Sequence, residues 1–568
     1  MIIGLDVGGT HTDAVLIGED RILRQAKVPT DHSNLFECVW TGLDKVTQDV
    51  PPGAIRRAVL STTLTTNAIA EGKLAKTAVV VSAGPGIDPA NFRIGSRYYC
   101  VSGSIDHRGR EIEPLREREI EKIAAKCLAE DIRQVAVISK FSVRNPEHEL
   151  KMAKILRGSC DHVVLGHRVS ANLSFPRRIA TAWLNAAVHP VHKRFFEAVE
   201  GSLKKRGLDI PIFVLKADGG TMSFEASIDV PGQTILSGPA ASVMGALPFA
   251  SGKLDTLVLD IGGTTTDMAV LVDRVPLLEP LGGEIGEHRT LIRALKTRSI
   301  ALGGDSAVRV ADGKLLIGPE RHGPAMAYGG SSPTPTDALF VLGKAQNGDA
   351  DASRRGMLPV AEQLGMALED AASRVLDLAC EKIILAARKM VEGINSKPVY
   401  TVKELLSGYK VNPVEILALG GPAPFFAPRI EKLTGIQTGA APQWHVANAI
   451  GAAMARNTSE VTLFADTERG MVLAPEEDFS RRIGKEFSRK DAIALAFELL
   501  RKKCAKAGAS ETELDLEVVE DNQFNMVRGF YTAGRNIRIR VQTRPGLIPE
   551  YQILARSMFN SCPLPGAI

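Results

Sequence analysis

Two stretches of the chain carry the same glycine, threonine and aspartate residues in the same order. One begins at Leu5 and reads LDVGGTHTDAVLI, and the other begins at Leu259 and reads LDIGGTTTDMAVL. Glycines let the backbone approach a ligand closely and adopt positive φ without strain. Successive N–H groups in such a turn form a nest for phosphate oxygens, and threonine hydroxyls add donors. The residues predicted to bind phosphate are Gly8, Gly9, Thr10 and Thr12 in the first stretch and Gly262, Gly263, Thr264 and Thr265 in the second.

An aspartate stands two residues before each glycine pair. A carboxylate at the end of the expected first strand is a hard oxygen ligand that holds Mg²⁺ through water. We therefore predict Asp6 and Asp260 as catalytic residues and as magnesium ligands, with Asp13 and Asp267 close behind each turn. The alternative is that the glycines form ordinary hairpin turns and the acids stabilise those turns by hydrogen bonds. Two copies with the same acids favour the phosphate interpretation.

A third glycine pair, Gly420–Gly421, follows the apolar run from Ile416 to Leu419 and precedes an expected helix start. A strand that runs into two glycines and then a helix suits a turn beneath an adenine or a ribose. Since it comes third, after two phosphate turns, we predict that Gly420 and Gly421 bind the adenosine part of a nucleotide.

The elements that must position these residues are two β-hairpins. Each stretch has an apolar run, a Gly-Gly turn and a second largely apolar run, which is the pattern of a tight hairpin. Repetition of this kind indicates a duplicated structural unit. The turns are not Walker loops, because the string GxxxxGK[ST] does not occur. Nor are they dinucleotide fingerprints, because a strand follows the glycines where a helix would be required.

Three further segments have clear periodicity. Residues 360–392 carry apolar residues at helical spacing, which predicts one long packed helix. A helix is also expected from Phe487 through Leu500, with Ser488 as its cap. Residues 515–541 alternate, which predicts two strands separated by a loop. Together with the preceding helix they should form a small α/β appendage.

Composition sets the remaining limits. At 568 residues the chain should divide into three or four units. The net charge of +4 gives no case for a nucleic-acid partner. Seven scattered cysteines without a CxxC pair favour a reducing cytoplasm. With no apolar run of about 20 residues, the sequence predicts a soluble, cytoplasmic protein with no membrane partner.

The three glycine elements, in this order, resemble those of actin, hexokinase and the heat-shock chaperone ATPases. The closer resemblance is to the hydantoinase/oxoprolinase A-subunit family and extends to about residue 455. The further segments that resemble motifs of this family are STTLTTNA at 61–68, FSVRNPEHE at 141–149, DGGTM at 218–222, LSGPAA at 236–241, GPE at 318–320 and PTPTDA at 333–338.

Two segments depart from the family pattern. The family leads into a GAGGGS loop through an Asp-x-His-Thr string, whereas residues 295–306 here lack the histidine and place Asp305 in the glycine loop. Residues 323–330 shorten the family's PGPACYGRGG and lack its cysteine. The region from about Glu460 onward matches no motif of the family. The substrate is therefore expected to be unusual if these segments bind it.

The resemblance implies an α/β fold with two ribonuclease-H-like lobes around a nucleotide cleft. We expect a first lobe at residues 1–185 with the first phosphate hairpin. A second lobe should span residues 186–457 and carry the second hairpin and the adenosine turn. Residues 458–568 should form the small C-terminal α/β appendage.

The resemblance also implies the chemistry. ATP with Mg²⁺ should phosphorylate an amide oxygen and so open a cyclic amide such as a hydantoin, 5-oxoproline or another lactam, together with a B subunit. A first alternative is a subunit of an ATP-dependent ketone carboxylase, acting through an enol phosphate. A second is a nucleotide switch that reactivates a partner enzyme. The sequence leaves open which small cyclic amide or carbonyl compound is used and whether the chain forms a homo-oligomer.

Overall fold

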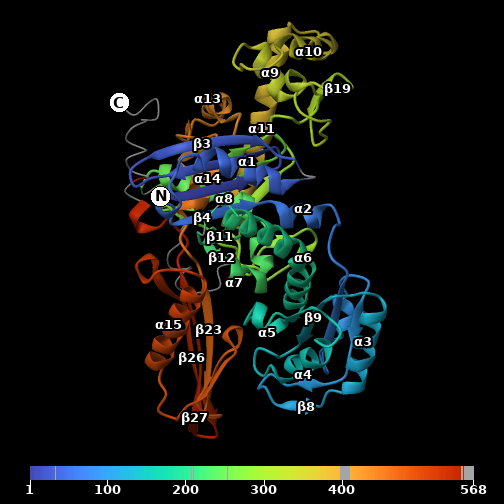
Figure 1. Cartoon of the computed structure of the whole chain (residues 1–568), viewed down its shortest axis with the longest axis vertical. Coiled ribbons are helices and arrows are strands. Elements are labelled where there is room, and N and C mark those ends of the chain that lie inside the picture. The colour runs from blue at the N-terminus through green and yellow to red at the C-terminus, as the bar shows by residue number, and fades with distance from the viewer. Residues whose placement is uncertain are drawn as a thin grey trace.

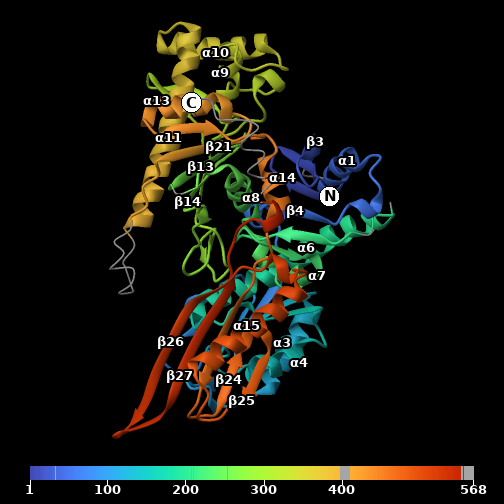
Figure 2. The same ribbon diagram turned by 90° about the vertical axis from the view of Figure 1, so that its left-hand side faces the viewer.

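The computed structural model describes residues 1–31, 34–205, 207–208, 210–252, 254–396, 410–551 and 554. Its four sheets of four or more strands stand in a long molecule (Figures 1 and 2). The second lobe lies at one end and the first lobe at the middle. The other end holds two smaller domains, one around β9 (Gln134–Ser139) and one around β23 (Glu460–Asp466).

The first lobe is built on a six-stranded sheet in which the first hairpin is central. Strands β1 (Ile2–Val7), β2 (His11–Ile17) and β3 (Ile22–Pro29) are antiparallel neighbours, while β1, β4 (Arg57–Thr62) and β11 (Ile212–Leu215) run parallel. All six residues of β1 are buried, as an apolar strand covered on both faces should be. The strands, in spatial order, are β12 (Thr221–Ser223), β11 (Ile212–Leu215), β4 (Arg57–Thr62), β1 (Ile2–Val7), β2 (His11–Ile17) and β3 (Ile22–Pro29). Its helices are α1 (Leu35–Thr47), α2 (Leu64–Ala70), α6 (Phe175–Lys205) and α7 (Phe224–Asp229).

The second lobe repeats this topology. Its strands β13 (Thr256–Ile261) and β14 (Thr266–Val272) form the second hairpin, and β13 runs parallel to β21 (Glu415–Leu419), as β1 runs parallel to β4 in the first lobe. The strands, in spatial order, are β15 (Val275–Pro276), β14 (Thr266–Val272), β13 (Thr256–Ile261), β21 (Glu415–Leu419) and β22 (Gln437–Ala440), and β18 (Thr297–Ile300) also pairs with β14. Its other elements are β16 (Glu284–Ile285), β17 (His288–Arg289), β19 (Val308–Ala311), β20 (Lys314–Ile317), α9 (Pro335–Val341) and α13 (Ala423–Thr434). The fold is thus the predicted pair of ribonuclease-H-like lobes.

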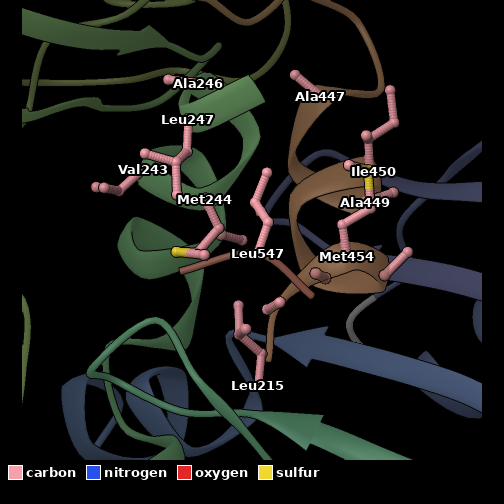
Figure 3. Close-up of a cluster of buried hydrophobic side chains, with 14 of the residues drawn as sticks. Leu215, Val243, Met244, Ala246, Leu247, Ala447, Ala449, Ile450, Met454 and Leu547 are labelled. Atoms are coloured by element: carbon pink, nitrogen blue, oxygen red, sulfur yellow. The ribbon is translucent and has the colours of Figure 1, made fainter. Parts of the chain in front are cut away.

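Two helices, α8 (Ser237–Ala246) and α14 (Ala447–Met454), pack against each other between the sheets of the two lobes. A Cβ on Gly451 would lie 2.2 Å from the backbone nitrogen of Gly245, so this crossing tolerates no side chain at Gly451. Leu547, near the end of the described chain, fills the space between them (Figure 3). One continuous apolar core therefore joins the lobes.

The prediction of one long helix over residues 360–392 is wrong. The structure has two helices, α10 (Ala350–Leu364) and α11 (Leu368–Asn395). The break falls at Gly365, which adopts φ +64° and ends α10 in the left-handed conformation that glycine favours at a helix C-terminus. The apolar spacing continues across the break because both helices pack on the same core.

A four-stranded parallel sheet is inserted into the first lobe between β4 and β11. Its strands, in spatial order, are β10 (His162–Leu165), β9, β5 (Thr77–Ser82) and β6 (Tyr98–Cys100). The accompanying elements are α3 (Glu117–Ala129), α4 (Glu147–Leu156), α5 (Gly166–Val169) and the small hairpin β7 (Ser104–Ile105) and β8 (Glu111–Glu113). The predicted boundary at residue 185 lies inside α6, and β11 and β12, which follow α6, belong to the sheet of the first lobe. The domain limits given above stay predictions.

The C-terminal region is a five-stranded antiparallel sheet with one helix on it, which is the predicted form of the appendage. The helix α15 (Arg489–Lys506) begins with the expected cap, because Ser488 and Asp491 form a capping box. The two predicted strands are also present and are joined by a tight turn at Gly529 and Phe530. The strands, in spatial order, are β25 (Phe479–Arg482), β24 (Met471–Ala474), β23, β27 (Tyr531–Thr543) and β26 (Leu516–Arg528). No described helix is long and apolar enough to cross a membrane.

Candidate functional site

Both predicted hairpins form, with matching hydrogen bonds at their turns. Gly8 N–H donates to the carbonyl of His11 at 3.0 Å, and Gly262 N–H donates to the carbonyl of Thr265 at 2.9 Å. Behind the turns the acids face each other in register, Asp6 opposite Asp13 and Asp260 opposite Asp267. The two turns are therefore structural copies of each other.

The two turns lie next to each other although they belong to different lobes. A Cβ placed on Gly263 would lie 3.5 Å from Cγ2 of Thr10, in the first turn. A Cβ on Gly9 would meet nothing within 4 Å, so the first turn is open on that side. The arrangement presents backbone from both lobes to one place, as a ligand gripped from two sides requires.

The threonines divide into two kinds. Thr264 is exposed in the second turn, and Thr10 is half-buried in the first. Thr12 is fully buried, and its hydroxyl lies 3.1 Å from the hydroxyl of Thr30, within the first lobe. Its equivalent in the second hairpin is Thr266, whose hydroxyl donates to the carbonyl of Leu302 at 2.7 Å. The hydroxyls at Thr10 and Thr264 are thus better placed for a ligand than that of Thr12.

The acids behind the turns are largely buried, and their environments differ. Burial raises the pKa of Asp6 to about 7, with the charges of Asp13 and Asp260 adding to the effect and a hydrogen bond from Ser61 opposing it. Burial and the charge of Asp260 raise the pKa of Asp267 to about 7. One carboxylate oxygen of Asp6 and one of Asp267 has no hydrogen-bond partner. Buried carboxylate oxygens without a partner are costly unless a ligand satisfies them.

Asp260 is held by two helices that join the lobes. Its Oδ2 accepts from the hydroxyl of Ser242 on α8 at 2.6 Å and from the amide of Asn448 on α14 at 2.9 Å. Sequence reasoning missed both partners. The sequence did contain a signal for them, since Ser242 and Asn448 are polar residues within largely apolar helical stretches. A buried polar side chain needs a hydrogen-bond partner.

The acids fit a magnesium ion only in part. Asp6 and Asp260 come from opposite lobes and have carboxylate oxygens near the turns, which suits a hard cation. Among the described residues, however, no group of three or more His, Cys, Asp or Glu is placed to hold a metal. A Mg²⁺ ion here would take most of its ligands from water and phosphate oxygens, as this ion commonly does.

The third glycine pair lies against the second hairpin. It joins β21 to α13, as predicted. Gly420 adopts φ +86°, and a Cβ there would lie 2.3 Å from the carbonyl of Ile261 and 2.7 Å from Oδ1 of Asp260. Only glycine fits this position. At Gly421 a Cβ would meet nothing within 4 Å, so the second glycine borders open space.

The loop that departs from the family pattern packs directly on the second turn. Gly304 N–H donates to the carbonyl of Gly262 at 2.9 Å, and Asp305 N–H donates to the carbonyl of Gly263 at 2.7 Å. The carboxylate of Asp305 also pairs with Arg321 at 3.2 Å. The sequence analysis identified Asp305 as a departure from the family pattern, but only the structure places it against the second glycine turn.

Comparison with known proteins agrees with the geometry. The sequence profile described as hydantoinase/oxoprolinase matches residues 178–461, and the profile of the hydantoinase/oxoprolinase N-terminal region matches residues 2–160. Three curated proteins are similar over much of the chain. An uncharacterised protein of Methanocaldococcus jannaschii is 26% identical over 68% of this chain. The caprolactamase subunit alpha of Pseudomonas jessenii is 24% identical over 68%, and the acetophenone carboxylase gamma subunit of Aromatoleum aromaticum is 24% identical over 74%. The matched region spans 64%, 62% and 63% of these three relatives' own lengths.

Two solved structures share the fold. The nucleotide-free structure of acetone carboxylase superposes with a TM-score of 0.72, at 17% identity, covering 97% of this chain and 88% of that one. ATP-dependent caprolactamase from Pseudomonas jessenii superposes with a TM-score of 0.70, at 19% identity, covering 96% of this chain and 88% of that one. At these identities the likeness concerns the fold.

Proposed function

The chain belongs to the hydantoinase/oxoprolinase family, and from this premise we propose that it is the ATP-using subunit of an enzyme that phosphorylates the oxygen of a cyclic amide. The observation that carries the proposal is the pair of matching glycine turns, contributed by two lobes and adjacent at Gly263 and Thr10. Each turn has an aspartate behind it. Such a pair suits a polyphosphate held from two sides.

In this proposal the first turn and the second turn hold the phosphates. Asp6 and Asp260 hold Mg²⁺ through water, and Gly420–Gly421 lies beneath the adenosine. Oriented donors and fixed charges are what phosphoryl transfer needs from a protein, because catalysis there is mainly positioning and charge neutralisation. The proposed phosphate donors are the N–H group of Gly263 and the hydroxyls of Thr10 and Thr264, while the N–H groups of Gly8 and Gly262 close the two turns.

ATP supplies the phosphoryl group. The bond between the γ-phosphorus and the β–γ bridging oxygen breaks, and a bond from that phosphorus to the amide oxygen forms, leaving ADP. A first water adds to the activated carbon, and the ring C–N bond breaks to leave an amine and an acyl phosphate. A second water then hydrolyses the acyl phosphate to a carboxylate and inorganic phosphate. Phosphorylation makes the carbonyl carbon a better electrophile, because the phosphorylated oxygen withdraws the electron density that amide resonance supplies.

A partner subunit is part of this proposal. Two of the curated relatives are named as subunits, of caprolactamase and of acetophenone carboxylase. We propose that this chain likewise works with a B subunit that completes the ring opening, on a small cyclic amide or carbonyl substrate.

The carboxylase relative supports a second candidate. It matches at the same 24% identity as the caprolactamase subunit and over a larger share of the chain. In that case the oxygen that receives the phosphoryl group is the enol oxygen of a ketone, and bicarbonate is the second substrate. The geometry of the two turns is compatible with both candidate reactions, because each begins with transfer of the γ-phosphoryl group of ATP to an oxygen of the substrate.

The first experiment measures magnesium-dependent ATP hydrolysis by the purified chain with hydantoins, 5-oxoproline and simple lactams. A parallel series uses ketones with bicarbonate. Stimulation by a cyclic amide supports ring opening, and stimulation that needs both ketone and bicarbonate supports the carboxylase.

The matched variants are Asp260→Ala, at the site, and Asp20→Ala, on the exposed turn between β2 and β3. Asp260→Ala should lose all turnover, and Asp20→Ala should keep it. Full ATP turnover by Asp260→Ala would contradict the proposed role of Asp260 as a magnesium ligand.

A further inference from the structure

Asp305 places a carboxylate directly against the second phosphate turn. A Cβ on Gly263 would lie 2.7 Å from Oδ2 of Asp305. The backbone of this loop is fixed there, because the Asp305 N–H donates to the carbonyl of Gly263 and the neighbouring Gly304 carbonyl accepts from both the N–H and the hydroxyl of Thr336, at 2.9 and 2.8 Å. A fixed negative charge beside an anion-binding turn opposes a phosphate unless a cation accompanies it.

Arg321 is that cation. Its Nη2 lies 3.2 Å from Oδ2 of Asp305, the same oxygen that faces Gly263. Arg321 keeps 35% of its side chain exposed, whereas Asp305 keeps 14%. The arginine therefore has room to move while the carboxylate does not. A guanidinium carries several donors in a fixed plane and binds carboxylate and phosphate oxygens in the same way.

The acidic side chains around the two turns would repel a bound phosphate unless a cation such as Arg321 lay nearby. Five acidic side chains gather here, although Asp6 and Asp267 are only partly ionised at neutral pH because their pKa values are raised to about 7. Lys27 of β3, beside the first hairpin, already contacts Asp13 at 2.8 Å and the carbonyl of His445 at 3.1 Å. A triphosphate adds further negative charge at its end. The five acids are Asp6, Asp13, Asp260, Asp267 and Asp305.

We propose that Arg321 is the ligand of the terminal phosphate of the bound nucleotide and that Asp305 holds it at the second turn until the nucleotide arrives. This inference rests on the proposed function, since it assumes that the second turn binds phosphate. Arg321 exchanges one oxyanion partner for another over a short distance, from the carboxylate at Gly263 to the phosphate at the same turn. The pair thereby distinguishes a nucleoside triphosphate from a diphosphate, which lacks the terminal group.

The test compares the affinities of the full-length chain for magnesium–AMPPNP and magnesium–ADP by titration calorimetry. Arg321→Ala should weaken AMPPNP binding about tenfold to a hundredfold, which is the contribution of one or two hydrogen bonds to a charged group. ADP binding should stay within about twofold. The control is Arg309→Ala, because Arg309 forms a comparable ion pair with Glu320, at 2.7 Å, on the adjacent exposed hairpin. This control should leave both affinities unchanged.

Asp305→Asn gives an independent readout. It removes the resting partner and the repulsion together, so AMPPNP binding should tighten several-fold. Combined with Arg321→Ala, it should keep only the part of that gain that comes from the lost repulsion. An unchanged AMPPNP-to-ADP ratio in Arg321→Ala overturns the inference. So does weaker AMPPNP binding by Asp305→Asn, which would make Asp305 a metal ligand. If the unaltered chain binds neither nucleotide, the proposed function fails as well, and the two failures are thus told apart.

Discussion

At the scale of single residues, the site depends on glycines with two different duties. At Gly420 the backbone itself demands glycine, because φ is +86° and a Cβ would strike the carbonyl of Ile261. At Gly9 a Cβ would meet open space, so the protein's own packing does not require glycine there. A requirement for glycine at Gly9 would therefore come from a ligand that approaches the backbone.

This contrast predicts different effects of matched substitutions. Gly9→Val should change the free energy of unfolding by less than about 1 kcal/mol and abolish ATP turnover, because the side chain fills the space that the ligand needs. Gly420→Ala should destabilise the fold by about 1–2 kcal/mol or more, because a left-handed conformation is costly for alanine and the contact with Ile261 must relax. Chemical denaturation and an ATPase assay measure both. Normal turnover in a stable Gly9→Val protein would argue against phosphate binding at the first turn.

At the scale of elements, the crossing of α8 and α14 controls how the hairpins meet. The two helices approach so closely at Gly245 and Gly451 that backbone touches backbone. The same helices carry Ser242 and Asn448, which hold Asp260. A change in the crossing would therefore move the acid at the second turn as well as the core.

We accordingly predict that Gly451→Ala is among the more damaging single-methyl changes in the chain. The added Cβ would lie 2.2 Å from the nitrogen of Gly245, so the helices must separate. Overpacking of this kind costs about 1–3 kcal/mol. Gly393→Ala, on α11 where a Cβ would meet nothing within 4 Å, is the control and should be neutral or slightly stabilising. The measurement is the melting temperature of each variant. Equal melting temperatures for Gly451→Ala and Gly393→Ala would contradict the close crossing of α8 and α14.

At the scale of the whole molecule, the inserted domain and the C-terminal domain touch through ionisable groups, of which His167 is fully buried and Asp478 is exposed. His167, on α5, is fully buried between Glu149, at 2.6 Å, and Asp478 of the C-terminal domain, at 3.2 Å. Glu476 accepts a hydrogen bond from the N–H of Ala171 at 2.7 Å. Arg168 also pairs with Asp478 at 2.8 Å, so the contact combines three charged or polar links.

This contact should weaken as the pH rises. Burial lowers the pKa of His167, but its hydrogen bonds to Asp478 and Glu149 outweigh burial and leave the pKa raised. Its stabilising contribution is then complete below about pH 6.5 and is lost as pH rises through the raised value. Burial raises the pKa of Glu476 to about 7, against the charge of Lys503, so ionisation of this acid between about pH 4.5 and 7 also costs stability. Both groups act in the same direction.

Hydrogen exchange at α5 and at the turn after β24 should therefore be faster at pH 9 than at pH 6, after correction for the intrinsic pH dependence of exchange. His167→Gln removes the titrating group and should flatten the difference. Burial lowers the pKa of nearby Arg178 to about 10, which is still above both pH values compared. Slower exchange at pH 9 than at pH 6 in the unaltered protein would contradict the stabilising role given to protonated His167 and neutral Glu476.

The sequence by itself determined the two hairpins, the strand–glycine–helix turn at Gly420, the capped helix at Ser488 and the duplicated lobes. These features are local, since the glycine positions and the alternation of apolar residues within a dozen residues define them. The sequence did not determine the break at Gly365 between α10 and α11, because a single glycine in an apolar helical pattern is compatible with a continuous helix.

Only the tertiary structure decided which residues surround the turns. Ser242 and Asn448 reach Asp260 from 18 and 188 residues away in the chain. Arg321 reaches Asp305, and both come to Gly263, through the packing of a loop on a hairpin. Such pairings follow from how helices cross and how loops fold back. No periodicity or spacing in the sequence encodes them, because each depends on contacts between elements that are distant along the chain.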